Sequence, residues 1–151
     1  MVATNSFATR TGNVSAGTSI FAMVVLEKAL EKLHRKIDCV TTPDNLQVAM
    51  VHANNCTSDL NAWGGLFADF LRAANIEMDT TTLFKTLYNE ALNNGAPDCE
   101  GIITYGYLSG ENITNIPEGS SLLARIPNSK FNEANLFISN LNTSLGAIRS
   151  V

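Results

Sequence analysis

The sequence predicts an α/β fold, in which short strands and hairpins pack against helices. Two observations predict it. Short runs of β-branched and aromatic residues bounded by turn residues are typical of strands, and longer segments with apolar residues three and four apart are typical of helices. The chain of 151 residues is long enough for a single sizeable core. With 45% hydrophobic and 16% charged residues, the composition is that of a globular domain rather than a disordered chain.

Charge and cysteine content narrow the possible partners and the location. The net charge of −4 argues against nucleic acid, because phosphate-backbone binders present a basic face. Cys39, Cys56 and Cys99 are odd in number and irregularly spaced, which favours reduced thiols and a cytoplasmic protein. The polar N-terminus does not resemble a signal peptide, and the longest apolar run, Ile20 to Leu26, is too short to span a bilayer. We therefore expect neither a membrane nor a nucleic acid as a partner.

The first third of the chain predicts strands around one helix. A short strand ending near residues 13–15 enters the Gly17-Thr18 turn, and residues 20–26 form a buried strand. Residues 27–35 are expected to form a helix, because Leu26, Ala29, Leu30 and Leu33 make an apolar stripe. Strand-like residues 37–42 and 48–52 flank a Pro-Asp-Asn turn and predict a β-hairpin.

Two helices follow this hairpin. The first is expected from Ser58, as the N-cap, to about Asn75, and Gly64-Gly65 in its middle indicates close packing or a kink. The second covers residues 81–93, with Asp79 or Thr80 as its cap and Asn94-Gly95 as its end. The inward faces of both helices are expected to comprise Leu60, Trp63, Phe67, Phe70, Leu71, Leu83, Phe84, Leu87, Tyr88 and Leu92.

The last third predicts two short strands and a final helix. The strands are residues 101–105 and 121–125, with a loop at residues 107–112 between them. The helix runs from Asn132 to about Ile148. Its inward residues are expected to be Leu136, Phe137, Leu141, Leu145 and Ile148.

The strongest candidate site is the stretch Thr11-Gly-Asn-Val-Ser-Ala-Gly-Thr-Ser19, which runs straight into an apolar strand. Glycine lets the backbone approach an anion closely, and hydroxyl and turn N–H groups are donors to phosphate. The residues alone also fit a plain hairpin turn without a ligand, which is the commoner use of such sequences.

Other reactive residues carry weaker signals. Cys56 lies four residues after His52, which allows a Cys–His dyad but fits an inert thiol better. The two histidines do not form paired zinc-ligand motifs, so no metal site is expected. Asp59 and Glu111 are expected at the surface in capping roles, although Gly110-Glu111 could also form a glycine-dependent turn whose carboxylate binds backbone N–H groups.

An ordered series of these segments resembles the FGGY carbohydrate kinases, a family that includes xylulokinase, ribulokinase, gluconate kinase and glycerol kinase. The turn resembles the Ser-Leu-Gly-Thr-Ser-Gly turn that opens the family's C-terminal domain. The segments that follow the family's order are Asn13–Ser19, the hairpin to Asn54-Asn55, the helix with Trp63, Leu87–Ala91, Asp98–Ile103, Tyr107–Glu111 and the helix of residues 131–148. The spacing is most similar to the ribulokinase and xylulokinase-like members.

The resemblance implies a ribonuclease-H-like (actin-like ATPase) domain and phosphoryl transfer from Mg²⁺-bound ATP to a sugar hydroxyl. Gly17 and Thr18 would contact the β- and γ-phosphates, and Ser15 and Ser19 would shape the turn. Two departures stand out. Asn112 occupies the position of the family's arginine after Gly-Glu, and no Gly-Asp dipeptide, the family's catalytic motif, precedes the turn.

The resemblance further implies that residues 1–151 are the first half of the C-terminal domain, without the sugar-binding N-terminal domain and the adenine-binding half. We accordingly expect no catalytic residue on this chain and no activity in isolation, with sugar and ATP as substrates of the full-length enzyme. The alternative is a non-catalytic interaction or assembly module that keeps part of a kinase fold and self-associates through exposed apolar faces.

Overall fold

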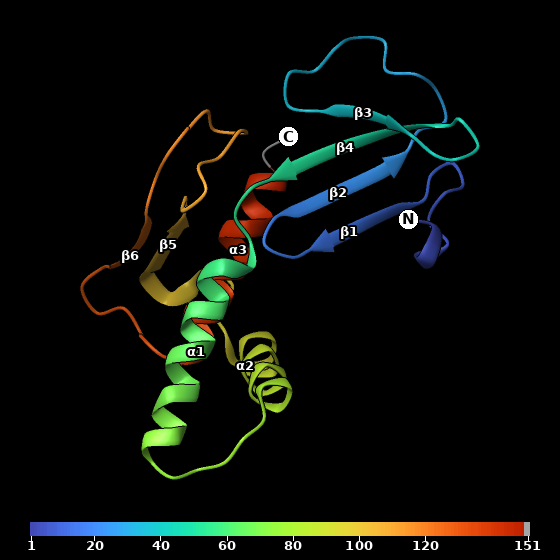
Figure 1. Ribbon diagram of the computed structural model, residues 1–151. Helices are drawn as coiled ribbons and strands as arrows, with labels where there is room; N and C mark the ends of the chain where they lie inside the picture. Colours follow the sequence, from blue (N-terminus) through green and yellow to red (C-terminus); the bar gives the residue numbers. More distant parts are fainter. Residues whose placement is uncertain (150–151) are drawn as a thin grey trace.

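The structure is a computed structural model that describes residues 1–149. It places an antiparallel sheet on one side and a group of helices on the other (Figure 1). The strand order is β1-β2-β4-β3, so β1 and β3 form the two edges. The strands of this sheet are β1 (Gly12–Ala16), β2 (Ile20–Val25), β3 (Asp38–Thr41) and β4 (Gln47–Ala53).

The four strands form where the sequence predicts them, because they carry β-branched or other apolar residues, and turn residues join β1 to β2 and β3 to β4. The β1–β2 hairpin pairs Ala16 with Ile20, which leaves Gly17, Thr18 and Ser19 as its tip. Central β2 also pairs with β4, in a register that sets Ile20 opposite Ala53. The hairpin tip therefore lies at the end of the sheet where β4 leads into the first long helix.

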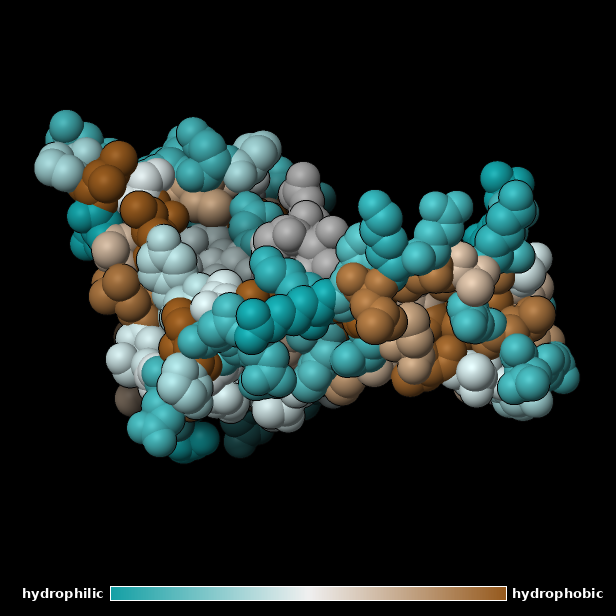
Figure 2. Space-filling model, turned by 90° about the horizontal axis from the view of Figure 1, so that it is seen from above, coloured by the Kyte–Doolittle hydropathy of each residue, from teal (hydrophilic) through white to brown (hydrophobic). Residues whose placement is uncertain are grey.

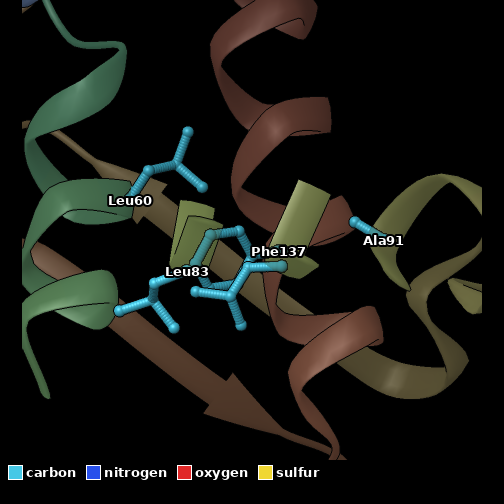
Figure 3. Packing of buried hydrophobic residues seen from close by; sticks show 5 residues of the cluster. Leu60, Leu83, Ala91 and Phe137 are labelled. Carbon is cyan, nitrogen blue, oxygen red and sulfur yellow. The ribbon is translucent and has the colours of Figure 1, made fainter. Parts of the chain in front are cut away.

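Helices α1 (Thr57–Ala73), α2 (Thr80–Asn94) and α3 (Glu133–Arg149) enclose the main core. Their buried side chains point toward one another, with Phe137 of α3 between residues of α1 and α2 (Figure 3). The buried members are Leu60, Leu83, Leu87, Ala91 and Phe137. Gly64 allows the close approach of α1 and α2, because a Cβ at this position would overlap the Phe84 ring. The close packing predicted from Gly64-Gly65 is therefore confirmed at Gly64.

A second hairpin, β5 (Ile102–Gly106) with β6 (Ser121–Arg125), packs on α3. Polar side chains join the two elements, because the Thr104 hydroxyl lies 3.0 Å from both the Ser139 and the Thr143 hydroxyls. The short 3₁₀ segments η1 (Val2–Thr4) and η2 (Cys99–Gly101) complete the described elements. Both predicted strands and the final helix are confirmed to within about two residues.

The helix predicted over residues 27–35 is wrong. The chain there is irregular and mostly exposed, and Leu33 of the expected apolar stripe is 99% exposed. A helix of nine residues needs tertiary packing to be stable in water, and its leucines have no core to pack against. This segment is instead the long connection between β2 and β3.

Three side chains expected to face inward lie exposed instead: Phe70, Leu92 and Leu145. Each lies at the margin of its predicted apolar stripe. Successive residues of a helix are 100° apart around its axis, so a residue at the margin can face either the core or the solvent. In α2 the small residue Ala91 takes the buried place next to Leu92. No helix among residues 1–149 is both long enough and apolar enough to cross a membrane.

Candidate functional site

The Gly17-Thr18 turn is the exposed tip of the β1–β2 hairpin. Ser15, Gly17 and Thr18 are exposed, and Ser19 is half-buried. The Gly17 N–H donates to the Ser19 carbonyl oxygen at 2.8 Å, which closes the turn. The four predicted residues therefore lie together, with Ser15 on the strand that leads into the tip.

The turn is fixed against the beginning of α1. The Cys56 N–H donates to the Thr18 carbonyl at 3.0 Å, and the Thr57 N–H donates to the Gly17 carbonyl at 3.1 Å. The first N–H groups of a helix lack partners within the helix, so the turn satisfies donors that would otherwise need a capping side chain. The expected N-cap role of Ser58 is wrong for this reason: α1 begins at Thr57 without a side-chain cap in the described structure.

The hydrogen bonds of the turn decide which of its N–H and hydroxyl groups are free to bind a ligand. The Gly17 N–H is occupied within the turn, so it is not available for the phosphate contact expected of it. Among the described residues, the Thr18 N–H, the Ser19 N–H and the Thr18 hydroxyl make no hydrogen bond. Neutral donors fixed on a rigid turn are suited to an anion such as a phosphate oxygen.

Gly17 itself is not required by the fold. Its φ is not in the left-handed region, and a Cβ there would meet only the Ser19 carbonyl oxygen, at 3.8 Å. The missing side chain therefore leaves open space beside the free Thr18 donors. Such space fits close approach by a bulky anion, which is the fit required of a phosphate.

A buried carboxylate holds the loop behind the turn. Glu111 is only 2% exposed, and its two carboxylate oxygens accept from the Asn54 N–H at 3.0 Å and the Ile113 N–H at 3.2 Å. The Ser19 hydroxyl in turn donates to the Asn54 carbonyl at 3.4 Å. Glu111 thus connects the 107–116 loop to the residues that support the turn, and the expectation of a surface position for it is wrong.

The turn formed by Gly110-Glu111 is confirmed as glycine-dependent. Gly110 has φ 64°, and a Cβ there would overlap the Pro117 carbonyl oxygen. Asn55 locks the same loop from the other side: its side-chain N–H donates to the Gly110 carbonyl at 2.6 Å, and its side-chain oxygen accepts from the Ser109 N–H at 3.0 Å. Sequence reasoning did not identify the role of Asn55, and only the unusual Asn-Asn pair before α1 could have indicated it.

The Cys56–His52 dyad is wrong. Cys56 is buried, and burial raises the pKa of its thiol, with a hydrogen bond from Ser144 opposing that effect only in part. His52 stacks on Phe21, with ring centroids 4.3 Å apart, and its buried Nε2 has no hydrogen-bond partner among the described residues. A raised pKa, with no hydrogen bond between Cys56 and His52 among the described residues, leaves the thiol protonated and inert.

Neither a group of metal ligands nor the hollow described below offers a second candidate site at the turn. Within residues 1–149, no group of three or more His, Cys, Asp or Glu side chains could hold a metal ion. Asp59 lies in the first turn of α1, but it is half-buried and its carboxylate makes no hydrogen bond among the described residues, so the surface capping role expected of it is wrong. A hollow of about 820 Å³ lies between the end of α1 and the start of α2. Since α1 is about 25 Å long, this hollow is remote from the hairpin tip.

Comparisons with known proteins identify the family. The family model described as the FGGY family of carbohydrate kinases, C-terminal domain, matches residues 12–151. This chain belongs to that family. The match begins at β1 and includes the Gly17-Thr18 turn and the Glu111 loop, so the resemblance seen in the ordered motifs is confirmed.

Solved structures agree on the fold. The chain is similar to xylulose kinase from Bifidobacterium adolescentis (TM-score 0.62, 20% identity, 94% of this chain and 25% of that one). Xylulose kinase from Rhodospirillum rubrum gives a TM-score of 0.67 at 16% identity over 92% of this chain and 26% of that one. Gluconate kinase from Lactobacillus acidophilus gives 0.57 at 13% identity over 93% and 26%.

The chain therefore spans about a quarter of the length of these solved structures. A search of curated proteins gives no significant match. The structural similarity nevertheless establishes the α/β fold of the FGGY C-terminal domain, which is of the actin-like, ribonuclease-H-like ATPase type.

Proposed function

We propose that this chain supplies the phosphate-binding turn of an ATP-dependent carbohydrate kinase. The observation that carries the proposal is the pair of free N–H groups at Thr18 and Ser19, on a turn anchored to α1 in a chain of the FGGY family. ATP bound with Mg²⁺ would supply the phosphoryl group that passes to a sugar hydroxyl.

Each residue of the turn has a distinct part in this proposal. The Thr18 N–H and hydroxyl and the Ser19 N–H donate to phosphate oxygens, while Gly17 leaves room for their approach. Ser15 and Ser19 shape the turn, and Glu111 keeps its support rigid through Asn54. Rigid, preorganised donors stabilise charge without reorganising when the ligand arrives.

The proposal limits what this polypeptide does in isolation. No Gly-Asp dipeptide precedes the turn in residues 1–11, so the base that would deprotonate the sugar hydroxyl is expected from another part of a complete enzyme. We therefore expect weak binding of ATP and no turnover by the 151-residue chain. Its free thiols at Cys39, Cys56 and Cys99 agree with a cytoplasmic location.

Two measurements test this function. Titration with Mg²⁺ and ATP should show weak binding, and Thr18→Ala should weaken it about tenfold, as expected for loss of one hydrogen bond to a charged group. Thr41→Ala, another exposed threonine, is the control and should bind like the wild type. Equal affinity of the Thr18 and Thr41 variants would make the turn a plain hairpin. Sugar-dependent release of ADP by this chain would contradict the expected lack of turnover.

A second candidate function is a non-catalytic assembly module. It is favoured by apolar side chains that the sheet leaves in solvent, including Val14 at 61% and Val24 at 49% exposure. Exposed apolar surface of this kind marks a contact with another polypeptide. Sedimentation of the chain as a monomer at all concentrations would remove this candidate, without affecting ATP binding at the turn.

A further inference from the structure

A small cavity lies between the first turn of α1, the end of β5 and α3. Its volume is about 10 Å³, which gives room for one water-sized occupant. Polar side chains make up most of its lining: Asn55, Ser58, Asp59, Asn140, Thr143 and Ser144. On the face shown in Figure 2, hydrophilic side chains lie in teal patches at the outer surface, where water reaches their polar atoms. Polar atoms enclosed between three elements need a partner of another kind.

Asn140 of α3 brings an oxygen without a partner to this cavity. Asn140 is only 6% exposed, and its Nδ2 donates to the Leu136 carbonyl at 2.8 Å. Its Oδ1 makes no hydrogen bond among the described residues. Asn55, by contrast, is bonded to the 107–116 loop through both its amide oxygen and its amide nitrogen. Because amide oxygens this deeply buried are normally hydrogen-bonded, the Asn140 oxygen indicates that the cavity has an occupant.

Asp59 of α1 brings a negative charge to the same cavity. Its carboxylate makes neither a hydrogen bond nor an ion pair among the described residues, and no lysine or arginine lines the cavity. Gly106 leaves space beside this carboxylate, because a Cβ there would lie 2.7 Å from the Asp59 Oδ2. The N-terminus of α1 favours a negative charge at this position, but it leaves the carboxylate oxygens without a bonded partner.

The two hydroxyl groups of α3 in the lining have committed their protons elsewhere. The Ser144 hydroxyl donates to the Asn140 carbonyl at 3.1 Å, and the Thr143 hydroxyl donates to the Thr104 carbonyl at 2.7 Å. A hydroxyl has one proton and two lone pairs, so toward an occupant both oxygens are acceptors. Together with the Asp59 carboxylate, they make the lining a set of acceptors that carries one negative charge.

A set of acceptors selects a cation over a water molecule. A water molecule has only two protons and would leave some of these oxygens unpaired, whereas a cation attracts all of them. Mg²⁺ keeps several water ligands, for which the cavity has no room, and Ca²⁺ takes six to eight oxygens. The lining holds one carboxylate, so its charge matches that of a monovalent cation.

We propose that this cavity binds one monovalent cation, Na⁺ or K⁺, through oxygens of Asp59, Asn140, Thr143 and Ser144. The bound cation joins the start of α1 to α3, next to the residues whose N–H groups hold the Gly17-Thr18 turn. The stability of the chain therefore depends on the identity of the salt. The proposal goes beyond the phosphate-binding function and does not rest on it.

Thermal unfolding in different chloride salts tests the proposal. Circular dichroism follows the Tm of the 151-residue chain while tetramethylammonium chloride, whose cation is too large for the cavity, is replaced by NaCl or KCl. The total salt stays at about 0.2 M, so that screening is constant. At ten times its Kd, the preferred cation should raise the Tm by roughly 3–6 °C. The same Tm in all three salts would overturn the proposal and leave a water molecule as the occupant.

Variants assign the effect to the cavity. Asp59→Asn removes the charge at nearly constant volume, so it should abolish the rise in Tm. Asp69→Asn is the matched control, because Asp69 is an exposed carboxylate on the same helix, and it should keep the full rise. A rise that Asp59→Asn retains in full would overturn this site.

Two further variants keep the test decisive if Asp59→Asn does not fold. Gly106→Ala narrows the cavity next to the Asp59 carboxylate, and Ser144→Ala removes one neutral oxygen. Each should raise the Kd of the cation at least about threefold, measured as a shift of the salt concentration at which half of the rise is reached. An unchanged midpoint in both variants would also overturn the site. These measurements contain no ATP, so their outcome is separate from that of the phosphate-binding tests.

Discussion

Replacing Glu111 by alanine should destabilise the loop on which the candidate site depends. The substitution removes both acceptors of the Asn54 and Ile113 N–H groups at a side chain that is almost completely buried. Each buried donor left without a partner costs about 1–3 kcal/mol, so the expected loss for the two donors is roughly 2–6 kcal/mol. For a domain of this size, about 3 kcal/mol corresponds to a fall in Tm of roughly 10 °C.

Thermal and urea unfolding followed by circular dichroism measure this effect. Glu118→Ala is the matched control, because Glu118 lies in the same connection between β5 and β6 but is exposed, and its loss should stay within about 0.5 kcal/mol. Glu111→Gln keeps one acceptor oxygen but turns an N–H toward a donor, so its stability should fall between that of the alanine variant and the wild type. Equal stability of Glu111→Ala and Glu118→Ala would refute the anchoring role assigned to Glu111.

Three further predictions follow from the described residues. Gly110→Ala should cost at least about 2 kcal/mol of unfolding free energy in the same assay, because the left-handed backbone is strained by a side chain; an unchanged Tm would contradict this. Hydrogen bonds from Thr82 lower the pKa of Asp79 in the fold, so its stabilisation is present above about pH 4 and is lost as the pH falls through the folded value. Asp79→Asn should flatten this acid slope in melts from pH 2.5 to 5, and an unchanged slope would contradict it. Iodoacetamide should alkylate exposed Cys39 at least about tenfold faster than buried Cys56, by mass spectrometry; equal rates would contradict the burial of Cys56.

The sequence was sufficient to predict the sheet and the three long helices, because their periodic apolar residues pack as the periodicity indicates. It failed for residues 27–35, where the apolar stripe ending in the fully exposed Leu33 has no neighbour to pack against. Periodicity describes the segment itself and not its partners, so a short stripe remains ambiguous. The predicted burial of Phe70 and Leu92 was wrong for a related reason. Both lie at the margin of an apolar stripe, where small changes in helix orientation decide whether a side chain is buried.

The candidate site was predictable in its position but not in its chemistry. Sequence order indicated the Gly17-Thr18 turn, whereas its anchoring depends on tertiary bonds from the start of α1, and the identity of its free donors depends on the bond from the Gly17 N–H to the Ser19 carbonyl. The same holds for Glu111, which as an acidic residue in a polar loop resembles a surface residue until its two N–H partners are known. Both features join segments far apart in the chain, and single-sequence patterns do not encode such pairs.

The central claim is that the free amides of the hairpin tip bind phosphate. It is tested most directly by following backbone amide resonances of the ¹⁵N-labelled 151-residue chain during a titration with ATP and Mg²⁺. We expect the largest shifts at Thr18 and Ser19, with a smaller change at Gly17, whose N–H is bonded within the turn. Shifts confined to other regions, or none at the turn at saturating ATP, would contradict it.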